Sequence, residues 1–165
     1  MKEIINEKLI ELDLNLKFKD IILLKLARKI HEDGRLTCDC DKNKTYKSDC
    51  NDYLEFVKAL KEREEVFSTA VGYSFAIPHG KSGYVKDTSI VYASLKEEMY
   101  WSEEEKIKHI FMIGVPDSKA SNEHLEILIK LSTSILDDDF RKKIENFDSK
   151  KEILDLIQDY VSRER

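Results

Sequence analysis

The sequence has no long hydrophobic run and no excess of positive charge. Its start, MKEIINEKLIELDL, contains no apolar core of signal-peptide length before charged residues interrupt it, and no later run approaches the length of a membrane span. We therefore expect a cytoplasmic protein without membrane insertion. Acidic residues (33) outnumber Lys and Arg (28), so the net charge of −5 does not favour nucleic acid as a partner.

Cysteine is scarce: only Cys38, Cys40 and Cys50 are present. An odd number of cysteines without an export signal argues against a disulfide framework and predicts thiols. Together with His31 they give a C-x-C-x9-C pattern, which departs from the paired spacing of zinc knuckles. The sequence thus predicts no metal site and leaves the role of the three cysteines open.

Motifs for nucleotide binding and serine hydrolysis are missing as well. There is no G-x-G-x-x-G, no G-x-x-x-x-G-K-[ST] and no G-x-S-x-G, and we find no repeat or linker. The 165 residues are 41% hydrophobic and 37% charged. These values predict one domain over residues 1–165, with a surface rich in Lys and Glu.

Hydrophobic periodicity predicts strands in the middle of the chain and helices on both sides of them. The expected strands cover residues 8–14, 75–77, 88–95 and 107–115, with a short strand or turn at 99–101. Five helices are expected, of which the first covers residues 18–32. The second has Ser48 or Asp49 as its N-cap, and its core face consists of Tyr53, Phe56, Val57 and Leu60. Three more follow residue 120, the first of them with a core face of Leu125, Leu128, Leu131 and Ile135. This order indicates an α/β fold in a single domain, with a mixed β-sheet flanked by helices.

The segment 63–81, REEVFSTAVGYSFAIPHGK, presents a histidine. His79 lies between Pro78, whose ring fixes the backbone, and Gly80, which has no side chain. We expect His79 on a loop that follows a short strand. Arg63 falls where the core stripe of the preceding helix would continue, and a charge there needs solvent or an anionic partner.

The other three histidines allow structural interpretations. His31 lies in the last turn of the first helix, where the helix dipole favours a cation. His109 alternates with apolar residues of the 107–115 strand, so we expect it to be hydrogen-bonded and partly buried. His124 falls in the first turn of a helix that Ser121 would cap, where backbone N–H groups favour an anion. The pattern leaves the structural and functional interpretations of His124 equally open.

A phosphoryl group fits the chemistry of these candidates. A neutral imidazole can act as a nucleophile at physiological pH. Arg63 and a helix terminus could then neutralise a group transferred to His79. The alternative is that His79 is a turn residue in a structural module, in which case Arg63 and His124 would lie far from it.

Several separated motifs resemble one known family. Arg63-Glu64, Ser68-Thr69, Gly72 and AIPHG, followed by Trp101, HIFMIGVP and EHLEILIKLSTSILDDDFRKKI, are similar to the IIA component of the bacterial sugar phosphotransferase system (PTS), fructose/mannitol type. The resemblance extends from about residue 9 to residue 157.

The resemblance implies a phosphate relay. His79 would take a phosphoryl group on Nε2 from the phosphohistidine of the carrier HPr and pass it to a IIB component. His124 and Arg63 would assist, and Thr69 would hydrogen-bond within the site. No cofactor or metal is implied. A mainly apolar partner surface would include Phe67, Tyr73 and Phe75.

Two departures from the family signature flank His79, one in the loop before it and one at Lys81 after it. Ala70 and Ser74 replace two glycines, and Phe75 stands at an aliphatic position, so we expect the loop to differ locally if either glycine served a positive φ. Gly80-Lys81 favours the fructose branch. The alternative function is that of a regulatory phospho-acceptor of the nitrogen-PTS or transcription-regulator type, acting through protein contact.

Overall fold

A mixed β-sheet forms the centre of the molecule. The computed structural model describes residues 3–38, 50–117 and 120–163. Within these ranges six strands make one sheet, five of them in the order β1-β5-β6-β3-β2. The sixth, β4, also pairs with β6, further along that strand than β3 does. Strands β5 and β6 are antiparallel, whereas β1 runs parallel to β5, and β3 and β4 run parallel to β6. The strands are β1 (Ile10–Leu14), β2 (Ala70–Gly72), β3 (Phe75–Ala76), β4 (His79–Ser82), β5 (Ser89–Tyr100) and β6 (Lys106–Pro116).

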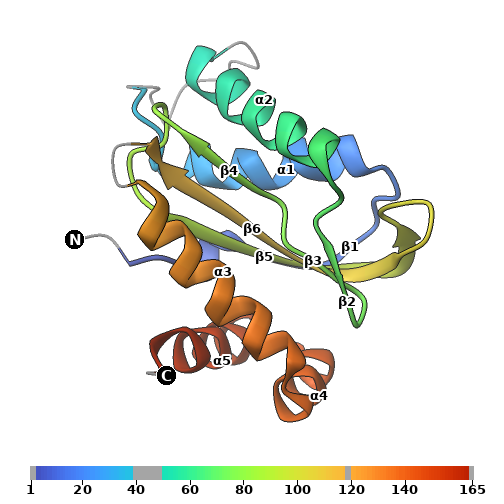
Figure 1. Cartoon of the computed structure of the whole chain (residues 1–165). Helices are drawn as coiled ribbons and strands as arrows, with labels where there is room; N and C mark the ends of the chain where they lie inside the picture. The colour runs from blue at the N-terminus through green and yellow to red at the C-terminus, as the bar shows by residue number, and fades with distance from the viewer. Residues whose placement is uncertain (1–2, 39–49, 118–119, 164–165) are drawn as a thin grey trace.

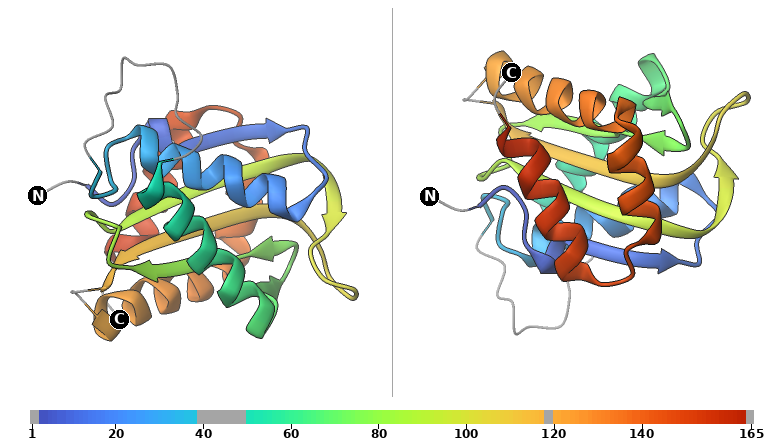
Figure 2. Two further views of the ribbon diagram at one scale, coloured as in Figure 1. Left: turned by 90° about the horizontal axis from the view of Figure 1, so that it is seen from above. Right: turned by 90° about the horizontal axis from the view of Figure 1, so that it is seen from below.

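Helices cover both faces of this sheet (Figures 1 and 2). One face carries α1 (Lys19–Glu32) and α2 (Asn51–Val66), and the other carries α3 (Ala120–Leu136), α4 (Asp138–Asn146) and α5 (Lys150–Ser162). A short 3-10 helix, η1 (Glu7–Leu9), precedes β1. The predicted mixed sheet flanked by helices is confirmed. No helix of the described part of the chain combines the length and apolar character that a membrane span requires.

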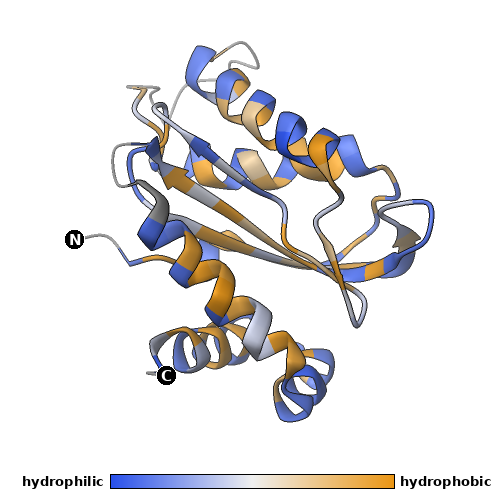
Figure 3. Ribbon diagram, viewed as in Figure 1, coloured by the Kyte–Doolittle hydropathy of each residue, from blue (hydrophilic) through white to orange (hydrophobic). Residues whose placement is uncertain are grey.

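Strand β6 is the core of the sheet, as its apolar sequence predicts. Its residues from Ile110 to Pro116 are all buried, and Figure 3 shows hydrophobic residues along most of the strand. Gly114 lets α2 approach closely, because a Cβ at this position would lie 3.0 Å from Phe56 Cζ. Contacts of this kind bring α2 close to the edge strand β4, where the same helix also packs on Gly80.

Besides the short strands β2 and β4, which the sequence did not predict, three elements differ clearly from the sequence prediction. Strand β5 continues through Tyr100, so the strand expected at 88–95 includes most of the short strand or turn expected at 99–101, with an irregular register between Ser94 and Met99. The N-cap of α2 is Cys50, whereas Ser48 and Asp49 lie outside the described residues. Helix α3 begins at Ala120, so the predicted cap Ser121 is already helical.

The predicted core face of α3 is also partly wrong. Leu125 is exposed, and Leu128 is only partly buried. The buried positions are Ile127, Leu131 and Ile135. The face is therefore rotated, because both hydrophobic stripes of this helix carry leucine and isoleucine and the sequence does not say which one meets the sheet.

His79 opens a strand, and the prediction of a display loop is wrong. The edge of the sheet is interrupted at Ile77 and Pro78. The Ile77 N–H turns away to the Thr69 carbonyl (2.9 Å), and Pro78 has no N–H, but its carbonyl accepts a hydrogen bond from the Ile113 N–H (3.0 Å). Pairing with β6 resumes at once, with His79 opposite Ile113. The backbone of the histidine is thus held in a ladder.

The turn between β2 and β3 keeps a backbone that favours glycine. Gly72, Tyr73 and Ser74 all have positive φ (90°, 54° and 74°), whereas Ala70 does not. The Ser74 carbonyl accepts hydrogen bonds from the N–H groups of Lys108 (2.8 Å) and His109 (3.0 Å), which ties the turn to β6. Of the two positions where glycine is replaced, only position 74 has a positive φ, and serine adopts this backbone conformation with some strain.

Candidate functional site

Arg63, His79 and His124 lie together although they come from three different elements. Arg63 is in the last turn of α2, His79 begins β4, and His124 is in the N-terminal part of α3. The Arg63 Nε–H donates to Nε2 of His79 (3.1 Å), and the rings of His79 and His124 have centroids 4.9 Å apart. Side chains from helices on opposite faces of the sheet thus lie together at its β4 edge.

Hydrogen bonds define the tautomer of His79. Its Nδ1 lies 2.7 Å from the Ile77 carbonyl oxygen, which can only accept, so Nδ1 carries the proton. Nε2 then holds the lone pair and accepts from Arg63. The guanidinium is itself oriented by a second bond, from Nη1 to the Phe67 carbonyl (2.7 Å). The reactive lone pair of the imidazole therefore points at a fixed positive charge.

Both histidines of the site are held in the neutral form. Burial lowers the pKa of His79, which is 9% exposed; the Ile77 hydrogen bond opposes the shift and the charge of Arg63 reinforces it. Burial likewise lowers the pKa of His124, and His79, Lys81 and Arg63 act in the same direction. Nε2 of His124 is buried without a hydrogen-bond partner among the described residues. This is a site with two neutral imidazoles and positive charge, which suits an anion.

Thr69 contacts a neighbouring network rather than His79. Its hydroxyl donates to Glu64 Oε1, and it accepts from Trp101 Nε1 (3.2 Å). Lys19 Nζ forms an ion pair with Glu64 Oε2 (2.8 Å). Through its carbonyl, Thr69 also holds the N–H of Ile77, the residue that anchors His79. Thr69 is thus linked to His79 only indirectly, through the backbone of Ile77.

Sequence reasoning missed Glu64 as the centre of this network. Its side chain is only 7% exposed and interacts with three residues. The signal was present, because Glu64 lies four residues after Leu60 on the core stripe of α2. Arg63 and Glu64 share the end of that stripe, and the charge there was assigned to Arg63 alone.

Two of the three apolar side chains predicted for a partner surface are exposed, and the third is buried. Phe67 (76% exposed) and Tyr73 (56%) are at the surface, as are Val66 and Leu125. Phe75 is buried and stacks on His109 with ring centroids 4.5 Å apart, so it is not part of a partner surface. The next residue, Ala76, is buried as well, so β3 is covered on both faces.

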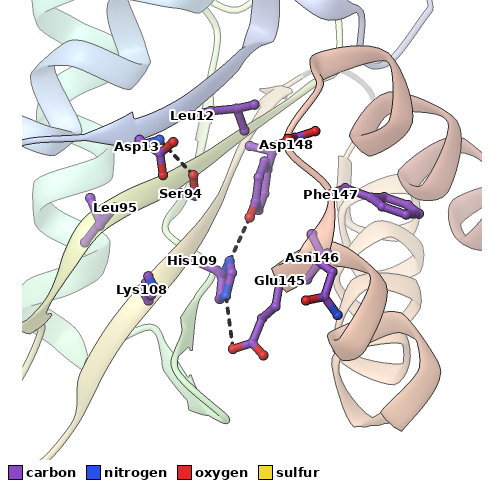
Figure 4. A pocket seen from close by; sticks show the side chains of 12 residues that line it. Leu12, Asp13, Ser94, Leu95, Lys108, His109, Glu145, Asn146, Phe147 and Asp148 are labelled. Atoms are coloured by element: carbon purple, nitrogen blue, oxygen red, sulfur yellow. Dashed lines mark hydrogen bonds and ion pairs between the residues drawn. The ribbon is translucent and has the colours of Figure 1, made fainter.

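A histidine outside this site, His109, lies in a pocket of about 380 Å³ between the sheet and α4 (Figure 4). The Tyr92 hydroxyl lies 2.7 Å from its Nδ1. Burial raises the pKa of Tyr92, which keeps the hydroxyl protonated and able to donate. Nε2 faces Glu145 Oε1 at 4.0 Å. The predicted hydrogen bond of His109 is confirmed, and its burial is greater than expected.

Comparisons with known proteins place the chain among sequence relatives and solved structures. A model of the family described as "Phosphoenolpyruvate-dependent sugar phosphotransferase system, EIIA 2" matches residues 3–160. The fructose-specific PTS EIIABC component of Bacillus subtilis is 28% identical over 160 residues, which is 96% of this chain but 23% of that protein. The fructose-specific EIIA component of Haloferax volcanii is 33% identical over 105 residues, 62% of this chain and 68% of the relative.

Two Escherichia coli relatives are also much longer than the matched part. The chain covers 16% of the 2-O-alpha-mannosyl-D-glycerate-specific EIIABC component (29% identity over 64% of this chain) and 12% of multiphosphoryl transfer protein 2 (35% over 60%). The chain thus spans less than a quarter of the length of three of these relatives.

Solved structures share the fold. The nitrogen regulatory protein IIA-Ntr from Neisseria meningitidis superposes with a TM-score of 0.77 at 22% identity, covering 93% of this chain and 96% of that one. IIA mannitol in its complex with phosphorylated IIB mannitol from E. coli gives 0.72 at 20% identity, with 94% and 97% covered. Because the family model spans nearly the whole chain, the protein belongs to the EIIA 2 family of phosphotransfer components of the sugar phosphotransferase system.

Proposed function

We propose that this chain is a phosphocarrier in which His79 accepts a phosphoryl group on Nε2 from phospho-HPr and donates it to a IIB component. The observation that carries the proposal is the fixed tautomer of His79. Nδ1 is committed to the Ile77 carbonyl, and Nε2 offers its lone pair beside the Arg63 guanidinium. The nucleophile, its orientation and the countercharge are then present in the resting site.

The transfer step needs no proton to leave the site. The Nε2 lone pair forms the bond to phosphorus, and the nitrogen of the donor phosphohistidine departs with the electron pair of the broken P–N bond. The imidazole of His79 gains positive charge, which the Ile77 carbonyl stabilises through the Nδ1–H. As the bond forms, the Arg63 N–H that faced Nε2 comes to face a phosphoryl oxygen.

His124 provides a second group for the phosphoryl oxygens. Its ring is tilted by 57° against that of His79, and its neutral form is maintained by burial and by nearby positive charge. A dianionic phosphoryl group on His79 opposes these charges. We therefore expect phosphorylation to raise the pKa of His124, so that it donates a hydrogen bond to the group. A histidine-selective NMR titration of the two states measures this change.

The partner surface is apolar around a recessed histidine. Val66, Phe67 and Tyr73 are exposed at the end of α2 and in the β2–β3 turn, with Leu125 exposed on α3. His79 itself is largely covered, so a partner has to fit closely over these side chains to reach Nε2. A structural relative, IIA mannitol, was solved in complex with phosphorylated IIB mannitol, which supports a IIB component as the acceptor.

Fructose or a similar sugar is the favoured substrate of the complete system. Relatives from B. subtilis and H. volcanii carry fructose-specific names, and Gly80-Lys81 fits that branch. A regulatory role is the second candidate, favoured by the fold shared with IIA-Ntr. Transfer from the phosphorylated chain to fructose-type IIB domains distinguishes the two, because a regulator would hold its phosphate in their presence.

The primary test reconstitutes the donor side. With phosphoenolpyruvate, the first enzyme of the system and HPr, the chain should take up one acid-labile phosphate. His79→Ala should take up none. The matched control is His109→Gln, which removes a buried histidine outside the site and should accept phosphate normally. Uptake by His79→Ala at the normal rate would contradict the assignment.

The supporting roles are tested by rate. Arg63→Gln and His124→Gln each remove one donor to the phosphoryl group, which costs about 10²-fold in comparable sites. Both variants should keep their circular dichroism spectrum and thermal unfolding curve. Normal transfer rates in both would show that neither residue acts on the phosphoryl group.

A further inference from the structure

Three side chains with metal-binding atoms meet at the start of α2. His31 lies in the last turn of α1, Cys38 follows the isolated bridge between Leu36 and Val85, and Cys50 is the N-cap of α2. One donor atom from each of the three lies within 4.8 Å of the others, and all three residues are half-buried. Cys38 and Cys50 are thiols.

The surrounding fold holds these three segments in place. The Tyr53 hydroxyl of α2 donates to the Leu24 carbonyl of α1 (2.9 Å), which joins the two helices beside the cluster. Thr37 donates its N–H to the Tyr84 carbonyl (2.9 Å) and its hydroxyl to Asp52. Thr37, the residue before Cys38, is therefore hydrogen-bonded both to Tyr84, which follows β4, and to Asp52 of α2. These contacts hold the three side chains of the cluster close together.

We propose that His31, Cys38 and Cys50 bind a zinc ion. Two thiolates and one imidazole are a donor set that zinc prefers. Zn–S bonds of about 2.3 Å and Zn–N bonds of about 2.0 Å in a tetrahedron place donor atoms about 3.5–3.8 Å apart. The observed spread of 4.8 Å needs a contraction of about 1 Å, which side-chain rotation of half-buried residues provides.

The charges near the cluster are compatible with this ion. Cys50 sits at the N-terminus of α2, where the helix dipole favours a thiolate. Arg28 Nη1 lies 3.5 Å from His31 Nδ1, and metal binding through either ring nitrogen ends this contact. The loss is small, because 3.5 Å is the outer limit of a hydrogen bond and Arg28 is also placed over the Tyr53 ring (3.7 Å).

The site is separate from the phosphate site and does not rest on its function. Arg63 lies 13 positions after Cys50 along α2, which corresponds to about 20 Å. The sequence spacing predicted no metal, because the usual templates take paired cysteines from one tight turn. Here the histidine comes from the end of a different helix. Cys40, the third cysteine, lies outside the described residues.

The first experiment measures binding in a Cys40→Ser background, so that both remaining thiols belong to the proposed site. Reduced protein is titrated with Zn²⁺ against a chromophoric chelator, and with Co²⁺ as a spectroscopic probe. We expect one ion per chain, thiolate-to-cobalt charge-transfer bands, and release of about two protons per zinc at pH 7, since each thiol loses one. Zinc at a hundredfold excess over its Kd should raise Tm by about 5–10 °C.

Single variants then test each ligand. Cys38→Ser, Cys50→Ser and His31→Gln should each weaken zinc binding at least ~100-fold, more than the loss of an outer-shell partner. Cys50→Ser is the most informative, because serine is a good N-cap and α2 should stay folded. His124→Gln is the matched control for adventitious imidazole binding and should leave the affinity unchanged.

Three results would overturn the proposal. The first is the absence of stoichiometric zinc, the second is a cobalt spectrum without thiolate bands, and the third is unchanged affinity in Cys50→Ser. A Cys38–Cys50 disulfide in protein isolated without oxygen would overturn it as well. Phosphate uptake by Cys50→Ser should be normal in every case, so this test and that of the phosphocarrier can fail independently.

Discussion

The buried histidine His109 should make the stability of this protein depend on pH. Burial lowers the pKa of His109 to about 4, and the nearby Lys108 adds to the effect. Glu145, at 4.0 Å, is 64% exposed and does not offset the burial. In the unfolded chain the pKa returns to about 6.5. As pH falls, the unfolded chain therefore binds a proton before the folded one does.

The magnitude follows from this difference in pKa. The contribution of His109 is fully present above pH 6.5 and is lost as pH falls toward 4. The total loss is about 3 kcal/mol, and about 2 kcal/mol of it falls between pH 7.5 and pH 5. For a chain of this size that corresponds to roughly 4–8 °C in Tm.

The comparison is between natural protein and His109→Gln, followed by urea unfolding at pH 7.5 and pH 5. Glutamine does not titrate but keeps an oxygen that can accept from the Tyr92 hydroxyl. The variant should lose about 2 kcal/mol less between the two pH values, whatever its stability at pH 7.5. Equal pH slopes for the two proteins, or an NMR titration of His109 in the folded state with a midpoint near 6.5, would refute the reasoning.

Three further substitutions test the packing around the site, each by urea unfolding. Ser74→Gly should raise the free energy of unfolding by about 0.5–1 kcal/mol, since glycine accepts the φ of 74° without strain but loses more chain entropy; a loss of stability would show that the turn is not strained. Lys19→Met leaves the buried Glu64 carboxylate without its cation and should cost about 1–3 kcal/mol, with no change counting against the network. Gly114→Ala should cost about 1–3 kcal/mol because its Cβ would lie 3.0 Å from Phe56 Cζ; a neutral effect would mean that α2 moves away freely.

Local periodicity was sufficient for the helices, for strands β1, β3, β5 and β6 and for the layers they form, but it did not predict the short strands β2 and β4. The apolar run that became β6 and the stripe of α2 ending at Leu60 are visible in the sequence, because burial of a strand or a helix face selects residues at fixed spacing. Boundaries were less accurate. The strand β5 passes through residues 96–98, Lys-Glu-Glu, which are exposed and carry no apolar signal.

The sequence predicted which residues form the candidate site but not how the surrounding backbone holds them. Arg63, His79 and His124 were named from the sequence, but the pairing of His79 with Ile113 joins residues 34 positions apart and leaves no local pattern. The same holds for His31 and the two cysteines, which meet only because α1 and α2 pack together. Long-range contacts of backbone or of polar side chains have no period that a sequence displays.

The parallel pairing of β1 with β5 has a consequence for the order in which the chain folds. Ile10 lies opposite Tyr92, so the two partners are 82 positions apart in the chain. At about 5–20 residues per second, the ribosome delivers the second strand roughly 4–16 s after the first. During this delay Ile10 and Leu14 have no sheet to join. We expect the β5–β6 hairpin, whose strands are close in sequence, to form first, so that the first strand synthesised is among the last to be placed.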